Sequence, residues 1–304
     1  MSTRTNGPAA GWHWLSKAVN LGGGNPRAVL GGAALMMAVA LVPSVVQLAV
    51  QGVAGTGNDA VMLGGLGLSL LFSLLVMGPL MAGYLRLLHA SETGAPTHPT
   101  AIFDIFRPGQ GAGRVIGVLL LLVVVGLALF GAIALVLGGD FFAGLLPVMQ
   151  ALEQAEPGSN PEIPPLPDGI GKLFALLFIV GLFFQGAYGI AMAQVALGGK
   201  GPGGALADGL VGALRNLLPL LVLAVVVVVM GMIAMLMMAL VVALLLAVGS
   251  LVHPALGMVL AAPVYLAVMV GVYVVMFGIV YYMWRDVCGD GDATPGGGHD
   301  SVAA

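Results

Sequence analysis

Residues 217–249 read LLPLLVLAVVVVVMGMIAMLMMALVVALLLAVG and contain no charged, amide or hydroxyl side chain. A hydrocarbon core of about 30 Å is crossed by about 20 residues of α-helix, so this stretch is long enough to span a membrane. It is too long for one perpendicular crossing and too short for two crossings with a turn between them. We therefore expect one helix that tilts or protrudes beyond the lipid.

Five further stretches reach spanning length without an Asp, Glu, Lys or Arg, and they cover residues 28–50, 61–85, 115–137, 173–197 and 254–284. Together the six stretches predict an all-α fold, a polytopic transmembrane bundle of six membrane-spanning helices with short interfacial amphipathic helices. The expected organisation is a cytoplasmic amino-terminal segment (1–27), the six-helix transmembrane domain (28–284) and a disordered cytoplasmic tail (285–304). We also expect the first seven residues to be disordered.

The composition excludes other classes of protein. Of 304 residues, 60% are hydrophobic and 8% are charged, against about 25% charged in an average soluble domain, so a water-soluble fold is excluded. The net charge is −3 and there is no run of like charges, so nucleic acid is not an expected partner. The single cysteine, Cys288, cannot form an intrachain disulfide and is expected to be a free thiol on the reducing side of a membrane.

The basic residues predict the orientation of the chain. Loops retained in the cytoplasm carry an excess of Lys and Arg. One side of the predicted bundle carries only Lys172, and the other carries Arg4, Lys17, Arg27, Arg86, Arg107, Arg114, Lys200, Arg215 and Arg285. This division predicts a multi-pass protein of a bacterial inner membrane with both termini in the cytoplasm.

Short amphipathic stretches precede each pair of spans, at residues 12–20, 101–107 and 205–216. In the third, Leu206, Leu210 and Leu214 share one helical face, which predicts a helix lying in the membrane interface. Three copies of one unit, or ordinary anchoring before each helix, both account for this pattern. The predicted interfacial anchors are Trp12, Trp14, Arg27, Arg114, Arg215, Trp284 and Arg285.

Residues 139–169 form the one sizeable external loop, which is acidic and rich in proline. Its second half is expected to be extended. Its first half carries an apolar stripe at helical spacing, which predicts a helix on the outer leaflet that serves as a lid, a docking surface or a plain connector.

No ionisable residue lies inside the six spans, which argues against a proton-driven or voltage-sensing mechanism. The polar side chains at mid-depth are Ser69, Ser73 and Gln185, for which hydrogen bonding between helices is favoured over substrate binding. Candidate helix kinks are Pro43, Pro79 and Pro263. Small residues at i and i+4 predict close helix packing, at Ala187 with Ala191, Gly189 with Ala193, and Ala267 with Gly271.

No motif for catalysis, cofactor binding or metal binding stands out, so the sequence predicts none of these sites. Our leading hypothesis is a non-enzymatic protein that packs with lipid, with other membrane proteins or with further copies of itself. A second hypothesis is a facilitator or permease for a small neutral or lipidic solute. A third is an enzyme acting on lipid at the interface through Asp104, Asp208 and His89.

Two short motifs carry a resemblance to a known family. Near the start of the chain, Gly11-Trp12-His13-Trp14-Leu15 is followed by Asn25-Pro26-Arg27. Later in the chain, an amphipathic stretch ends in Arg215-Asn216, with Pro219 three residues on. With these motifs the chain resembles a family of uncharacterised bacterial six-helix inner-membrane proteins, over about residues 11–286. The resemblance implies six helices and a cytoplasmic amino terminus, and it implies no activity.

Overall fold

The computed structural model describes residues 3–54, 59–153 and 170–289, and within these ranges every regular element is a helix, without a β-strand. Six of its helices or helix pairs are long and apolar enough to cross a membrane, so the predicted all-α, six-span architecture is confirmed. The spans are Pro26–Val53, Asp59–Glu92, Ala112–Val136, Ile170–Ala196, Leu217–Ser250 and Ala255–Val287.

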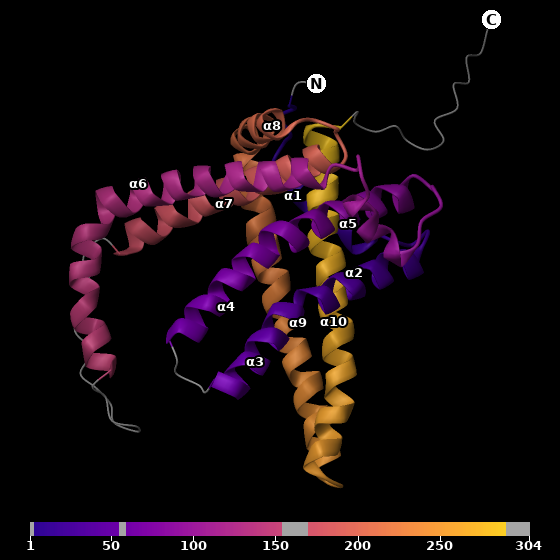
Figure 1. Ribbon diagram of the computed structural model, residues 1–304, viewed down its shortest axis with the longest axis vertical. Helices are drawn as coiled ribbons and strands as arrows, with labels where there is room; N and C mark the ends of the chain where they lie inside the picture. The colour runs from indigo at the N-terminus through magenta and orange to yellow at the C-terminus, as the bar shows by residue number, and fades with distance from the viewer. Residues whose placement is uncertain (1–2, 55–58, 154–169, 290–304) are drawn as a thin grey trace, which may run out of the picture.

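The spans form three hairpins that spread from one packed end (Figure 1). The first consists of α2 (Pro26–Ala40) and α3 (Val42–Ala54), followed by α4 (Asp59–Phe72), the π-helical segment η1 (Ser73–Met77) and α5 (Gly78–Glu92). The second consists of α6 (Ala112–Glu153) and α7 (Ile170–Ala196), and the third of α9 (Leu217–Ser250) and α10 (Pro254–Val287). In Figure 1 the α6–α7 hairpin runs across the direction of α9–α10 rather than along it.

Short helices precede each hairpin at the packed end. They are α1 (Ala10–Val19), the 3-10 helix η2 (Pro99–Phe106) and α8 (Pro202–Arg215). We call this end the collar, and define it as α1, η2 and α8 together with the adjoining ends of α5, α7 and α10 (residues 84–92, 188–196 and 281–288). The buried core of the protein lies in the collar and in the first turns of the spans next to it.

Two spans are interrupted next to a proline. Between α2 and α3 the helix breaks at Leu41, and Pro43 occupies the first turn of α3, where a missing N–H costs nothing. Before Pro79 the amide of Gly78 donates to the carbonyl of Ser73, five residues back. Because Pro79 has no N–H to donate to the carbonyl four residues back, the helix widens by one residue there. Pro263, by contrast, lies inside an unbroken α10.

The external loop differs from its predicted boundaries. The helix α6 does not end at residue 137 but continues through Pro147 to Glu153, because the apolar stripe after residue 140 keeps the helical period of the span before it. The predicted surface helix is therefore a continuation of α6. The proline-rich half of the loop, residues 154–169, lies outside the described residues, as does most of the tail after Gly289.

Close packing in the collar uses small residues. A Cβ atom added at Gly209 of α8 would lie 2.5 Å from the carbonyl oxygen of Ala187 and 2.9 Å from the Cβ of Ala191. This confirms the predicted seam at Ala187 and Ala191. A Cβ atom added at Gly271 would meet no described atom within 4 Å, so Gly271 makes no close approach within the chain, and a seam between copies there stays a prediction.

Candidate functional site

Side-chain hydrogen bonds between distant parts of the chain gather in the collar. One set joins the second hairpin, α8 and the third hairpin. The indole N–H of Trp284 donates to Gln194 Oε1 at 2.8 Å, and the amide of Gln194 donates to Asp208 Oδ2 at 2.5 Å. Asp208 also accepts an ion pair from Lys200. Because Gln194 is buried, each of its polar atoms needs a protein partner, and this network provides them.

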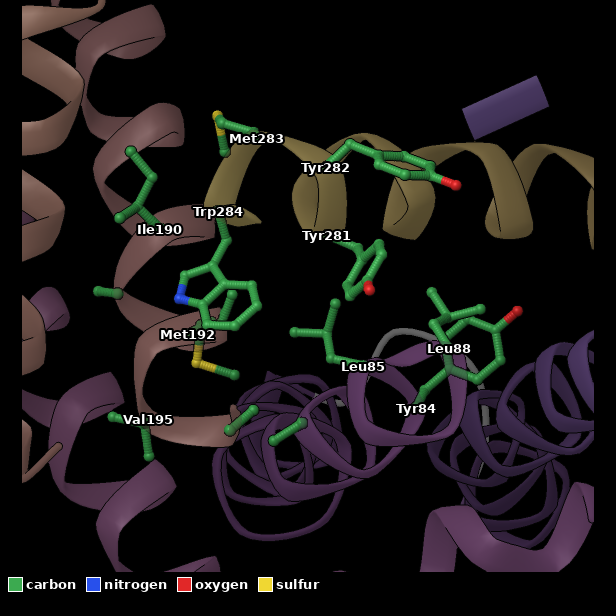
Figure 2. Close-up of a cluster of buried hydrophobic side chains, with 14 of the residues drawn as sticks. Tyr84, Leu85, Leu88, Ile190, Met192, Val195, Tyr281, Tyr282, Met283 and Trp284 are labelled. Atoms are coloured by element: carbon green, nitrogen blue, oxygen red, sulfur yellow. The ribbon is translucent and has the colours of Figure 1, made fainter. Parts of the chain in front are cut away.

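The same collar joins the first hairpin to the third. The hydroxyl of Tyr282 donates to Glu92 Oε2 at 2.6 Å, and His89 Nδ1 lies 3.2 Å from the hydroxyl of Tyr281. Around these bonds the apolar side chains of α5, α7 and α10 interlock (Figure 2), with Leu88 among them. Tyr281, Tyr282 and Trp284 at the end of α10 are therefore buried against protein rather than facing lipid.

The amino-terminal residues are tied to the collar, and the expectation that the first seven residues are disordered is wrong for residues 3–7. The N–H of Arg4 donates to the carbonyl of Val287 at 2.8 Å, and its carbonyl accepts from Asn216 Nδ2 at 2.9 Å. Asn216 is fully buried and also accepts from the N–H of Asn6 at 2.8 Å. Arg215 donates to the carbonyl of Thr3 at 2.7 Å.

Two arginines hold the end of α7. Arg86 Nε donates to the carbonyl of Ala196 at 2.9 Å, and Arg114 donates to the carbonyl of Gly199 at 3.1 Å. The last carbonyls of a helix have no partner within it and carry partial negative charge. Side chains from α5 and α6 therefore stabilise the carboxyl end of α7 and the turn after it, and Arg86 joins the first hairpin to the second.

The predicted anchors divide into two groups. Trp12 is 49% exposed and Arg27 is exposed, as interfacial anchors are. Trp14 and Trp284 are buried inside the protein, where Trp14 donates to Asp286 Oδ2 at 2.8 Å. These two indoles join helices instead of contacting the membrane interface, because each N–H has a side-chain acceptor on a neighbouring helix. The guanidinium of Arg285 lies 5.8 Å from the centre of the Tyr282 ring.

The polar side chains at mid-depth lie outside the packed region. Ser69 is half-buried, and Ser73 and Gln185 are exposed. Within the described ranges none of the three makes a side-chain hydrogen bond. Gln185 precedes Gly189 by four residues, so it lies on the face of α7 that Gly189 presents to Met283 of α10.

The residues of the enzymatic hypothesis have separate partners. Asp104 pairs with Arg107 at 3.0 Å on the surface of η2, Asp208 pairs with Lys200, and His89 contacts Tyr281. Among the residues that the structure describes, no three His, Cys, Asp or Glu side chains are close enough to hold a metal ion. Cys288 is buried, and burial raises the pKa of its thiol to about 11, with the carboxylate of Asp208 adding to the rise.

Sequence reasoning missed the residues that join the collar: Gln194, Asn216, Asp286 and Glu92. Gln194, Asn216 and Asp286 lie within three residues of the end of a predicted span or amphipathic stretch, and that position is the signal that could have found them. Glu92 lies seven residues beyond the predicted span 61–85 and carries no such signal. No family model, curated protein or solved structure matches this chain. The resemblance to bacterial inner-membrane proteins therefore stays a prediction carried by its short motifs.

Proposed function

We propose that this protein is a non-enzymatic scaffold of the bacterial inner membrane, with the collar at the cytoplasmic face and the three hairpins among the lipid tails. The observation that carries the proposal is the contrast in packing along each hairpin. No span buries more than 28% of its most apolar 18 residues within the protein. Apolar helices with so little internal packing present their surfaces to lipid or to the helices of a partner.

Residues 227–237 of α9 illustrate the contrast. All eleven are exposed, and eleven residues make three turns of helix, so every face of α9 is open there. Membrane spans tilt by about 20° on average, and the hairpins in Figure 1 diverge more widely than three spans of one flat bilayer do. We infer that the hairpins take up a common direction in the membrane, with lipid tails or partner helices filling the space between them.

The proposed orientation follows from the ten basic residues: nine lie on one side of the spans, and Lys172 alone lies on the other. Reporter fusions test it. A fusion at Gly199 is expected to report the cytoplasm, and one at His253, between α9 and α10, the opposite side. The same side for both fusions would contradict the proposed topology.

A second candidate is a facilitator for a small neutral or lipidic solute, and the exposed Gln185 favours it. A carboxamide without a partner at membrane depth is unfavourable, and a polar solute passing between α7 and α10 would supply that partner. A scaffold needs no such group.

One reconstitution separates the two candidates. The full chain is placed in proteoliposomes and the uptake of small neutral solutes and the flipping of labelled lipid are measured. The scaffold predicts rates equal to those of protein-free vesicles, together with a stoichiometric membrane protein co-isolated after cross-linking in native membranes. Saturable flux that Gln185→Leu abolishes, and that the control Gln47→Leu on the first hairpin leaves unchanged, would replace the scaffold with the facilitator.

A further inference from the structure

A groove of about 670 Å³ opens in the collar between the amino-terminal segment, α1 and the end of α10. Its lining residues are Arg4, Asn6, Gly7, Ala9, Ala10, His13, Lys17 and Asp286. The groove is distinct from the openings between the hairpins, because every lining residue belongs to the collar or to the segment tied to it.

The charges that line the groove are two cations and one carboxylate. The carboxylate of Asp286 already accepts a hydrogen bond from the indole of Trp14 at 2.8 Å. The ammonium of Lys17 lies 5.9 Å from the centre of the Tyr282 ring. The groove therefore carries a net positive charge that is not neutralised within its own lining.

Arg4 is held by its backbone, which leaves its side chain available. Its N–H and carbonyl bond to Val287 and Asn216. The guanidinium is exposed and has no hydrogen bond or ion pair with any residue that the structure describes. A guanidinium with a fixed backbone and free N–H groups is suited to bind the oxygens of a phosphate.

The position of α1 places the groove at the edge of the membrane. One face of α1 packs on α9 and α10, where a Cβ atom at Gly11 would lie 2.3 Å from the carbonyl oxygen of Pro219. Away from that face, Trp12 is 49% and Val19 63% exposed. Tryptophan is enriched at the level of lipid headgroups, so we expect α1, whose His13 and Lys17 line the groove, to lie at that level.

We propose that this groove binds the phosphate of an anionic phospholipid headgroup, with Arg4 and Lys17 contacting the phosphate oxygens and the His13 ring supplying a further N–H. An anionic lipid neutralises the net charge of the groove, which a zwitterionic lipid does not. The proposal deepens the scaffold function by naming a lipid class, and it rests on that function. The test of the groove measures lipid binding, whereas the scaffold is tested by flux and by co-isolation. The lipid proposal and the scaffold proposal can therefore fail separately.

The experiment measures lipid retention by native mass spectrometry. The purified full chain in detergent is mixed with equal amounts of phosphatidylglycerol, phosphatidylethanolamine and phosphatidylcholine. The double variant Arg4→Gln/Lys17→Gln is compared with Arg107→Gln/Lys172→Gln, which removes the same charge from exposed residues outside the groove. We expect the groove variant to lose about tenfold or more in phosphatidylglycerol retention, and the control to lose less than about twofold.

Misfolding could also lower lipid retention, so a second variant is chosen that should raise it. Asp286→Asn keeps an oxygen that accepts from Trp14 while removing the negative charge, so it is expected to retain more phosphatidylglycerol than the native chain. If Asp286→Asn instead lowers retention of phosphatidylethanolamine, the groove recognises a zwitterion and the proposal is overturned.

Two further outcomes would also overturn it. Equal losses in the groove and control variants would mean that lipid binding depends on net charge alone. Displacement of phosphatidylglycerol by inorganic phosphate at equal concentration would mean that the ligand is free phosphate rather than a lipid.

Discussion

The collar and the outer parts of the hairpins contain the same apolar residue types, yet only the collar packs. Leu88 in the collar is fully buried, whereas Leu240 of α9 is 65% exposed. The difference lies in the neighbours of these leucines. The collar has small residues that lie against neighbouring helices and polar side chains that bond across helices. Between residue 226 and Gly249, α9 has no polar side chain, and a Cβ atom at its Gly231 would meet nothing within 4 Å; close approach returns only where Gly249 meets Gly257 of α10. In a membrane, hydrophobicity alone does not drive helices together, because lipid tails are equally apolar.

The largest expected effect comes from shortening one leucine in the collar and, as its control, one leucine in the outer part of α9. Leu88→Ala leaves a cavity among packed helices and is expected to lower the free energy of unfolding by about 2–5 kcal/mol. Leu240→Ala removes a side chain that contacts little protein and is expected to cost less than about 1 kcal/mol. Unfolding equilibria of both variants in bicelles measure the difference. Equal losses would mean that α9 packs on protein after all.

Asn216 tests the polar part of the collar. Asn216→Ala leaves the carbonyl of Arg4 without its donor and the N–H of Asn6 without its acceptor, and it is expected to cost about 1–3 kcal/mol. The control Asn20→Ala removes only an exposed bond to the carbonyl of Ser16 and is expected to cost less than about 0.5 kcal/mol. Protease sensitivity of residues 3–7 should rise in the first variant alone, and no change there would contradict the role given to Asn216.

Glycine substitutions test how closely the helices approach. A Cβ atom at Gly83 would lie 2.1 Å from the carbonyl oxygen of Ile102, whereas one at Gly231 meets nothing within 4 Å. Gly83→Ala is expected to lower the free energy of unfolding by about 1–3 kcal/mol through overpacking. Gly231→Ala is expected to leave it unchanged or to raise it by up to about 1 kcal/mol, because alanine favours the helix. A loss in Gly231→Ala would show a helix contact that the structure does not have.

The smallest effect concerns the thiol of Cys288. Its pKa is raised to about 11, so the thiol stays protonated at pH 8, and alkylation of the folded chain should accelerate only as pH rises toward 11. Asp208→Asn removes the nearby carboxylate and should lower the pKa, though not to its ordinary value, because burial remains the larger cause. Alkylation rates between pH 7 and 11 measure both. A rate that rises near the ordinary pKa of about 8.5 would contradict the burial of Cys288.

The six spans could be predicted because an uninterrupted apolar run of spanning length has few alternatives in a membrane. Which face of each helix packs on protein could not be predicted in the same way. The leucine stripe of α8 predicted a helix in the membrane interface but did not indicate which face packs on protein. Leu214 is exposed, and the helix packs through small residues such as Gly209 and Gly212. Close approach of backbones, rather than burial of leucine, decides the contact between membrane helices.

The polar bonds of the collar were hidden for a different reason. Trp14 and Trp284 were expected at the lipid interface because indoles are stable there. Whether an indole faces lipid or a neighbouring helix depends on an acceptor such as Asp286 or Gln194 lying within reach. These partners are 272 and 90 residues away in the sequence, and no local pattern encodes them.

The central claim is that the helices lose their protein contacts once they leave the collar, and α9 tests it most directly. Spin labels placed one at a time at residues 227–237, in a chain carrying Cys288→Ser and reconstituted in lipid bilayers, report collisions with dissolved oxygen. The account predicts high oxygen accessibility at every position without helical periodicity, because each of these residues is exposed. A protected stripe repeating every 3.6 residues would show that α9 is packed on protein along its length, and would contradict the account.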